Sequence, residues 1–508
     1  MNRTLLLAFC LLVSFTSFAQ TKVDLEALDK YYARMVEDWD IPSASIGIVK
    51  DGELIFTGNY GVKEIGKSER PDQNTLYAIA SNSKAFTSAL IGVLVQEGKL
   101  GWDDKVKKHL PYFAMYDEWV SNHMTIRDLL CHRSGLGTFS GDNIWYKSEA
   151  TAEDFIKHIQ YVPQAFEFRS GYGYSNLMYI TAGEVIETVT GKTWAQNVKE
   201  RFLDPLGMDR SIASVNDLES KGNYAIPHGR ENDENKVIPW VSWDNVAATG
   251  GLISSVEDLS KWVIFNLNNG IVGNDTILAP STRNTVWTPH NNFPVNQADD
   301  NFDQHFSSYG LGWSLSDYHG RMKVGHTGGY DGMITAVTMI PDENLGVIVL
   351  TNGVKSPIMA ATNYALDSFL GLEVRDWSAQ LLARANARAK NDTRISDRIA
   401  SREMNTSPSI QADEFAGNYY SDVYGDISIK REDEDLKLIF GHSPLLTASL
   451  THWHHDVWEI HWDHPQAWFS FGTIKINTDN NLKVIGFDFD VPNDDFFFEE
   501  LKPYRMEE

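Results

Sequence analysis

The chain has 508 residues, which exceeds what one compact core usually holds and predicts at least two domains. Hydrophobic residues at 42% and charged residues at 22% are ordinary for a folded protein and exclude global disorder. The formal net charge of −25 would repel nucleic acid and anionic membrane surfaces, so neither is expected as a partner.

The first twenty residues (1–20) are typical of a cleaved signal peptide. Arg3 supplies positive charge, and the apolar stretch that follows is short for a membrane span. Small residues at Ser17 and Ala19 suit a cleavage point just before Gln20. We therefore expect a periplasmic or secreted protein with no membrane span after signal removal; an uncleaved anchor is the alternative.

Signal removal leaves Cys131 as the single cysteine, so no intrachain disulfide is expected in the mature chain. Cys131 follows Leu129 and Leu130 at the end of an apparent helix. We expect it to be a buried apolar filler rather than a nucleophile.

Residues 21–371 carry patterns of both helices and strands. Helices are predicted over 25–39, 81–97 and 360–370, and a mostly helical section is predicted over 101–262. Strands are predicted over 44–49, 53–58, 310–314, 321–325, 333–340 and 345–351. The first two strands flank Asp51-Gly52, a strong hairpin turn. Strands from both ends of the segment, with helices between them, predict one sheet flanked by helices in an α+β arrangement.

The composition changes after residue 371. Residues 372–410 are rich in Ala, Arg, Asn, Asp and Ser, which predicts a partly helical linker. Residues 411–508 are aromatic and alternating. Short strands are predicted there over 419–420, 426–430, 436–440, 457–462, 468–476 and 484–489. This spacing predicts a small all-β barrel or sandwich.

The first chemical signal is Ser81-Asn82-Ser83-Lys84, where a helix is predicted to begin. A spacing of three residues brings the Lys84 amine within reach of the Ser81 hydroxyl. Serine becomes a nucleophile only when a base removes its proton, and burial with the positive helix end favours a neutral lysine amine. Free backbone N–H groups at the same helix end suit an oxyanion. Alone, the pattern also fits an N-cap serine beside a solvated lysine.

Two further segments favour the chemical interpretation. Tyr174-Ser175-Asn176 lies in a glycine-rich aromatic loop, and His326-Thr327-Gly328-Gly329 follows a predicted strand. Ser-x-x-Lys, Tyr-x-Asn and His-Thr-Gly in this order resemble the serine β-lactamase and penicillin-binding-protein superfamily. Three more segments resemble its class C branch: residues 129–136, 204–208 and 248–252. The resemblance covers about 25–370 and implies an antiparallel sheet flanked by helices, with an all-helical lobe.

The resemblance also implies roles for individual residues. Ser81 would be acylated, with Lys84 activating it. Tyr174 would shuttle protons during acylation and deacylation, its pKa lowered by the neighbouring lysine. The backbone N–H groups of Ser81 and Gly329 would form the oxyanion hole. Without the resemblance, Tyr174 could be a packing aromatic residue.

Substrate contacts would come from Asn176, His326, Thr327 and Gly328. Glycine at 328 and 329 would let the strand edge approach the substrate closely. Without the resemblance, His326 could be a surface residue at a strand end.

His326 departs from the lactamase pattern, which has lysine at this place. A permanent ammonium helps hold a β-lactam's carboxylate, whereas imidazole is mostly neutral at pH 7. Histidine here is more similar to certain D-amino-acid-specific peptidases and esterases of the superfamily. We therefore expect a small-molecule or peptide substrate, cleaved at an amide of a D-amino-acid peptide or at a carboxylic ester. A true β-lactamase and a non-hydrolytic penicillin-binding sensor are the alternatives; Tyr174 argues against the sensor, which needs no deacylation base.

Histidines gather at 452, 454, 455, 461 and 464. Strand alternation would place His452 and His454 on one face, as metal ligation requires. A polar outer face is the preferred interpretation, because no second set of ligands has diagnostic spacing. No metal or other cofactor is expected.

The segment 415–420 and the strand pattern after it are similar to the small lipocalin-like barrels appended to some members of the superfamily. Such a barrel could limit access to the active site or mediate assembly of a homo-oligomer.

Overall fold

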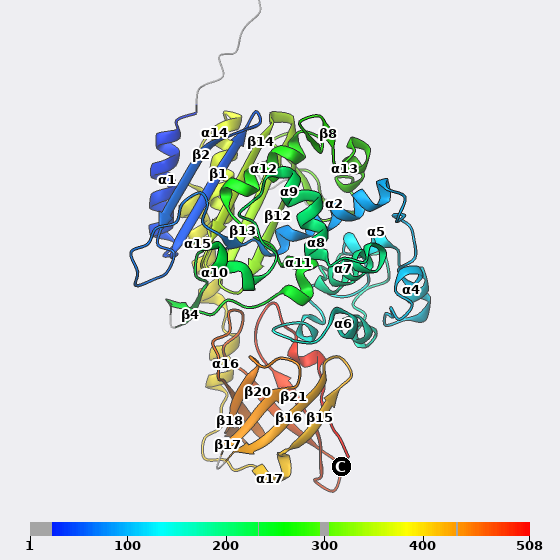
Figure 1. The fold of residues 1–508 in the computed structure, drawn as a ribbon. Coiled ribbons are helices and arrows are strands. Elements are labelled where there is room, and N and C mark those ends of the chain that lie inside the picture. Colours follow the sequence, from blue (N-terminus) through cyan, green and yellow to red (C-terminus); the bar gives the residue numbers. More distant parts are fainter. Residues whose placement is uncertain (1–22, 232, 295–303, 433–434, 508) are drawn as a thin grey trace, which may run out of the picture.

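The computed structural model describes residues 23–231, 233–294, 304–432 and 435–507. The predicted signal peptide, residues 1–20, lies outside the described residues. The described chain forms an N-terminal domain of helices and strands, with a β-barrel below it in the view of Figure 1.

An eight-stranded sheet forms the centre of the N-terminal domain, in the order β2-β1-β14-β13-β12-β11-β10-β9. Its strands are β1 (Ser43–Lys50), β2 (Glu53–Gly61), β9 (Asn291–Asn292), β10 (Ser307–Tyr309), β11 (Ser314–Tyr318), β12 (Arg321–Tyr330), β13 (Met333–Ile340) and β14 (Leu345–Thr351). Every neighbouring pair is antiparallel, and β1 pairs with β14 from the far end of the domain. The predicted α+β arrangement is therefore confirmed.

Helices cover both faces of this sheet. On one face, α1 (Leu25–Asp38) and α14 (Ile358–Leu370) pack against alternate residues such as Ile46 and Ile48. On the other face, α12 (Val256–Leu267) packs against the remaining alternate residues. All residues of β14 are buried because both of its faces are covered, which explains its continuous apolar sequence.

A helical lobe lies beside the sheet and packs around α2 (Ser83–Gln96) (Figure 1). The other helices of the domain are α3 (Val106–His109), α4 (Glu118–His123), α5 (Ile126–Leu130), α6 (Ala152–His158), α7 (Asn176–Thr190), α8 (Trp194–Val198), α9 (Asp204–Leu206), α10 (Leu218–Lys221), α11 (Ala247–Gly250) and α13 (Pro280–Val286). Three two-stranded ribbons complete it: β3 (Tyr77–Ala78) with β6 (Ile253–Ser254), β4 (His228–Glu231) with β5 (Glu234–Val237), and β7 (Ile271–Val272) with β8 (Asp275–Thr276).

Two sequence predictions for the sheet differ from the structure. The strand predicted over 310–314 is a turn, because Gly312 has a φ of +76° and the chain reverses there between β10 and β11. The His326–Gly329 segment lies inside β12 rather than after it. Its glycines lower strand propensity, but pairing with β13 holds the segment in the sheet.

The C-terminal domain is a closed antiparallel barrel, which confirms the barrel alternative. Its strands are β15 (Gly417–Ser421), β16 (Gly425–Glu432), β17 (Asp435–Phe440), β18 (Thr447–His454), β19 (Val457–Trp462), β20 (Thr473–Thr478), β21 (Val484–Asp490) and β22 (Tyr504–Arg505). Helix α17 (Ala412–Phe415) precedes β15, and buried aromatic side chains such as Phe440, Phe487 and Phe489 fill the interior.

Three features of the barrel were not predicted. Strands β18 and β22 were missed, the first because it is largely Thr, Ser and His and the second because it is very short. The strand predicted over 468–476 begins only at Thr473. The residues before it form a loop that extends toward the N-terminal domain.

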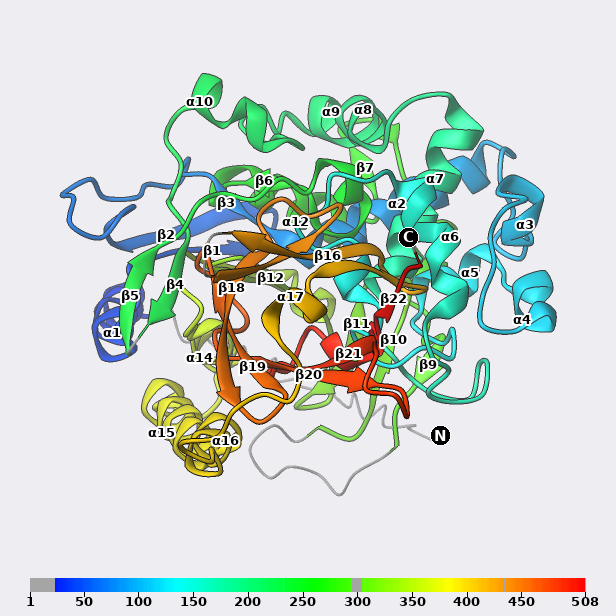
Figure 2. The same ribbon diagram turned by 90° about the horizontal axis from the view of Figure 1, so that it is seen from below.

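Two helices, α15 (Trp377–Asn391) and α16 (Arg394–Ala400), connect the domains (Figures 1 and 2). Arg398 pairs with Asp490 at 2.6 Å, and Arg394 pairs with Asp494 at 3.0 Å. Exposed ion pairs stabilise weakly, typically by about 0–1 kcal/mol each. They therefore orient the barrel rather than supply most of its attachment.

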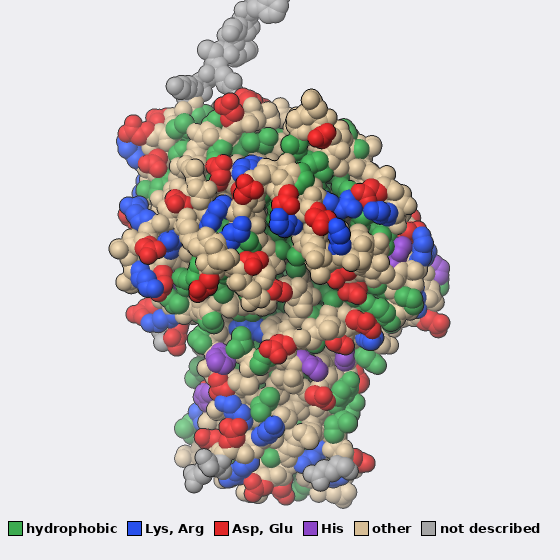
Figure 3. All heavy atoms as spheres, in the orientation of Figure 1, with side chains coloured by type: hydrophobic (Ala, Val, Ile, Leu, Met, Phe, Trp, Pro, Cys, Tyr) green, Lys and Arg blue, Asp and Glu red, His purple; other side chains and the backbone are tan. Residues whose placement is uncertain are grey.

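Acidic and basic side chains are interspersed over the face shown in Figure 3, and histidines are visible where the domains meet. Among the helices of the described ranges, none is long and apolar enough to cross a membrane. Cys131 is fully buried, as predicted, and burial raises the pKa of its thiol to about 12.

Candidate active site

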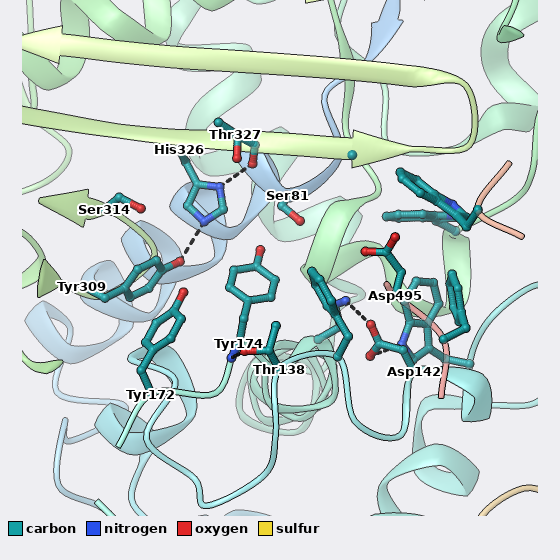
Figure 4. A pocket seen from close by; sticks show the side chains of 17 residues that line it. Ser81, Thr138, Asp142, Tyr172, Tyr174, Tyr309, Ser314, His326, Thr327 and Asp495 are labelled. Atoms are coloured by element: carbon teal, nitrogen blue, oxygen red, sulfur yellow. Dashed lines mark hydrogen bonds between the residues drawn. The ribbon is translucent and has the colours of Figure 1, made fainter. Parts of the chain in front are cut away.

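A cavity of about 380 Å³ lies where the sheet, the helical lobe and the barrel meet (Figure 4). Most of the predicted site residues line it: Ser81, Tyr174, Asn176, His326, Thr327 and Gly329. Lys84 is buried beside Ser81, behind the cavity wall, and Gly328 packs away from the cavity.

Ser81 lies in the short 3₁₀ helix η1 (Ala80–Asn82), directly before α2. The helix predicted over 81–97 therefore begins as a tighter turn. Ala80 adopts a left-handed conformation with φ of +47°, which costs a non-glycine residue roughly 1–2 kcal/mol. The turn is held in place because the Ile79 carbonyl accepts from Thr335 Oγ1 at 3.0 Å.

Lys84 is fully buried and contacts three oxygens. Its Nζ lies 3.0 Å from Ser81 Oγ, 2.7 Å from Asn176 Oδ1 and 2.8 Å from the Thr249 carbonyl oxygen. Burial lowers the pKa of the amine well below its ordinary value, and nearby Asp142 offsets this only in part. Burial therefore shifts the Lys84 equilibrium toward the neutral amine.

Tyr174 points its hydroxyl into the cavity (Figure 4). That hydroxyl has no hydrogen-bond partner within the described part of the chain. Burial raises its pKa well above the ordinary value, although neighbouring Ser81 opposes the rise. The prediction of a pKa lowered by Lys84 is therefore wrong, because burial of the phenol has the largest effect on its pKa.

The Tyr174 loop owes its position to a close packing contact. A Cβ at Gly173 would lie 1.8 Å from the Leu136 carbonyl oxygen, so only glycine fits there. From the same 129–136 segment, His132 Nδ1 accepts from the Ser175 N–H at 3.0 Å, and its ring lies 4.2 Å from the Tyr174 ring. The 129–136 motif therefore supports the Tyr174 loop.

His326 is buried and hydrogen-bonded through both ring nitrogens. Nδ1 lies 2.6 Å from the Thr327 carbonyl oxygen, which can only accept, so Nδ1 carries the proton. Nε2 then accepts from the Tyr309 hydroxyl at 2.8 Å. Burial lowers the pKa of His326 to about 3. The imidazole is therefore neutral at pH 7.

The edge of β12 is open beside the cavity. Strand β11 pairs with β12 only as far as Gly325, whereas β13 pairs with it from Val324 to Tyr330. The segment carrying Thr327 and Gly329 therefore has one edge without a described strand partner. An extended ligand backbone can pair at such an edge.

Gly328 was predicted to let the strand edge approach the substrate, but in the structure it faces the turn that carries Ser81. A Cβ at Gly328 would lie 2.2 Å from the Ile79 carbonyl oxygen and 2.7 Å from Thr335 Oγ1. Its missing side chain makes room for the turn that carries Ser81, not for a ligand. Gly329 does line the cavity, opposite the Trp468 ring of the barrel.

Residues 28–370 match the family model described as Beta-lactamase. The chain belongs to the beta-lactamase family. Residues 401–503 match DUF3471, a domain of unknown function, which corresponds to the barrel.

Relatives and solved structures are similar over much of this beta-lactamase-family chain. An unguisins hydrolase from Aspergillus campestris is 28% identical over 441 residues, covering 82% of this chain and 80% of the relative. Protein flp from Staphylococcus aureus is 29% identical over 336 residues, which cover 64% of this chain and 62% of that protein. The octameric penicillin-binding protein homologue from Pyrococcus abyssi has the same fold, with a TM-score of 0.62 and 22% identity. The match covers 92% of this chain and 98% of that chain. A D-stereospecific amidohydrolase from Streptomyces gives a TM-score of 0.54 at 21% identity, and the match covers 67% of this chain and 98% of that chain.

Other residues of the cavity were missed from the sequence. They are Thr138, Phe139, Asp142, Trp145, Tyr172, Trp243, Tyr309, Ser314, Trp468, Asp495 and Phe496. Asp142 accepts from Asn176 Nδ2 at 2.6 Å and from Trp145 Nε1 at 2.9 Å, and burial raises its pKa to about 7. It begins the short 3₁₀ helix η2 (Asp142–Ile144) after Gly141, and no sequence motif marks this segment.

The histidine cluster does not form a metal centre within the described ranges, where no three His, Cys, Asp or Glu side chains are grouped closely enough. A register shift in β18 between His452 and His454 breaks the alternation assumed from the sequence. His455 instead pairs with Glu403 at 3.0 Å.

Proposed function

We propose that this chain is an exported serine hydrolase that forms an acyl-enzyme at Ser81 and cleaves an amide or a carboxylic ester. The observation that carries the proposal is the 3.0 Å contact between Ser81 Oγ and the buried Lys84 Nζ at the cavity wall. A buried neutral amine in contact with a serine hydroxyl is the arrangement that activates such a nucleophile.

The contacts of Lys84 account for a general-base role. A neutral amine has two N–H groups and one lone pair. Its two N–H groups donate to Asn176 Oδ1 and to the Thr249 carbonyl. The lone pair is then directed to Ser81, whose O–H donates to it. Lys84 takes this proton as Oγ attacks the substrate carbonyl.

The remaining steps use groups around the same cavity. The oxyanion would accept from the backbone N–H groups of Ser81 and Gly329. Tyr174 is a protonated phenol, so it would donate its proton to the leaving group and recover one from the Lys84 ammonium. Water then attacks the acyl-enzyme with its proton passing to the same pair, which releases the acid and restores Ser81.

The cavity disfavours β-lactams as preferred substrates. Neutral His326 stands where a charged lysine would hold a β-lactam carboxylate, and Tyr309 further fixes its neutral tautomer. The similarity to an unguisins hydrolase supports hydrolysis rather than a stalled sensor. The predicted signal peptide supports a periplasmic or secreted location.

Turnover of a chromogenic ester tests the proposal. The purified chain should release many equivalents of p-nitrophenol from p-nitrophenyl acetate or butyrate, with nitrocefin cleaved poorly by comparison. Ser81→Ala should lower turnover to background while its circular dichroism spectrum stays unchanged. Release of a single equivalent would indicate a sensor, and efficient nitrocefin cleavage would indicate a true β-lactamase.

A further inference from the structure

The barrel places one carboxylate in the active-site cavity. Asp495 lies in the segment between β21 and the short helix η8 (Phe498–Glu500) and lines the cavity (Figure 4). Trp468 and Phe496 of the barrel line it as well. Its neighbour Asp494 points elsewhere and pairs with arginines of α15 and α16. Asn493 Oδ1 accepts from the Asp495 and Phe496 N–H groups at 2.9 and 2.6 Å, which fixes this orientation.

The carboxylate of Asp495 has no partner in direct contact among the described residues. It forms no hydrogen bond or ion pair with any residue that the structure describes, and the cavity lining contains no Lys or Arg. The second acidic side chain, Asp142, already accepts from Asn176 and Trp145. Burial and neighbouring Asp494 raise the pKa of Asp495 to about 6, although the charge of Arg388 opposes the rise, so at neutral pH the carboxylate is mostly ionised with no cation in contact with it. A partly buried, unpaired carboxylate is costly unless a ligand compensates it.

The surroundings of Asp495 suit an organic ammonium group better than a metal ion or a neutral polar group. Aromatic rings of Trp145, Trp243, Trp468 and Phe496 line the same cavity. The Trp145 and Trp243 rings lie 5.2 Å apart and the Trp145 and Phe496 rings 6.4 Å apart, so they form a continuous wall. Aromatic faces attract ammonium groups, and one carboxylate supplies the charge that pairs with a single amine.

The position of Asp495 indicates which part of the substrate carries the amine. In Figure 4, Tyr174 and His326 lie on one side of Ser81 and Asp495 lies on the other. The proposed proton donor Tyr174 must face the leaving group. The acyl group therefore extends from Ser81 toward Asp495.

We propose that Asp495 binds the ammonium group of the acyl part of the substrate, so that the enzyme prefers aminoacyl esters or amides with a free amine. This inference rests on the proposed hydrolase function. The hydrolysed bond is the ester or amide at Ser81; the amine stays on the acid that is released. The barrel thus supplies a specificity-determining residue.

A matched pair of substrates tests this inference. Glycine ethyl ester and N-acetylglycine ethyl ester differ in the charge on the amine, and neither has a stereocentre. At pH 7, kcat/KM should be roughly tenfold or more higher for the free amine, as charge-assisted hydrogen bonds are about twice as strong as neutral ones. Asp495→Asn should bring the ratio close to one. The ratio comes from a single preparation, so a partly unfolded variant does not change it.

Glu499→Gln is the matched control, because this carboxylate is exposed on the same segment and does not line the cavity. It should keep the wild-type ratio. A wild-type ratio near one, with p-nitrophenyl acetate still hydrolysed, overturns this inference but leaves the proposed function standing. An unchanged preference for the free amine in Asp495→Asn has the same consequence. Failure to hydrolyse every ester, p-nitrophenyl acetate included, contradicts the proposed function and this inference with it.

Discussion

His326 shows at the residue scale how burial sets a protonation state. Its folded pKa of about 3 lies below the ordinary value of about 6.5, so between these values the unfolded chain binds a proton that the folded protein does not. Stability therefore falls as pH falls through this range. The loss attributable to His326 is about 2 kcal/mol between pH 7.5 and pH 5.

His326→Gln tests this at the residue scale. Glutamine can still contact Tyr309 and the Thr327 carbonyl but cannot titrate. The stability advantage of wild type over the variant should shrink by about 2 kcal/mol from pH 7.5 to pH 5, measured by urea unfolding at both values. His132, whose pKa is also lowered by burial, is present in both proteins and cancels. An advantage that does not change with pH would contradict a neutral, buried His326.

The local chemistry of the site could be predicted from the sequence because it depends on short spacings. A spacing of three residues across the junction of η1 and α2 brings Lys84 to Ser81, with Nζ and Oγ 3.0 Å apart. The Tyr174 ionisation was not predictable in the same way. Its pKa depends on burial by segments far along the chain, which raises it where a charged lysine would have lowered it.

At the scale of elements, the contact between β12 and η1 positions Ser81. The Gly328 Cα faces the Ile79 carbonyl, and any side chain there would overlap it. Because β12 is paired with β13, the strand cannot retreat and the turn carrying Ser81 must move instead.

Gly328→Ala should therefore displace Ser81. Overpacking of this kind typically costs about 1–3 kcal/mol, and we expect at least a tenfold loss of ester turnover. Gly229→Ala is the control, because a Cβ at that strand glycine would meet only the Ile238 side chain, at 3.3 Å from Cγ2. Measuring ester turnover and thermal unfolding on the same variant separates displacement of Ser81 from loss of stability. Equal activity of both variants would show that this contact does not position the nucleophile.

At the scale of the whole molecule, the barrel forms part of the cavity wall. Periodicity could predict its strands, but not that the loop carrying Trp468 and the segment carrying Asp495 line the same cavity as Ser81. That arrangement follows from the packing of one domain on the other, and no local pattern encodes it. Residues 468–472 were predicted as strand rather than loop, because aromatic residues favour strands as well as lining cavities.

Glu500 couples the barrel to the cavity. Its carboxylate accepts from the Ser140 hydroxyl and, at 2.8 Å, from the Gly141 N–H. These residues adjoin Phe139 and Asp142, which line the cavity. The contact therefore holds the loop that lines the cavity.

Glu500→Ala should leave two polar groups without their acceptor, at a cost of about 1–3 kcal/mol. We expect a melting temperature lower by a few degrees and reduced ester turnover. Glu499→Ala, on the exposed side of the same turn, should change neither. If both variants behave like wild type, the barrel does not support the loop through Glu500.

The central claim, an acyl-enzyme at Ser81, is tested most directly by the mass of the labelled protein. After reaction with a fluorophosphonate, the whole chain should gain one adduct, and peptide mapping should locate it on Ser81. Ser81→Ala should gain none. An adduct on another serine, or ester turnover that persists in Ser81→Ala, would contradict the account.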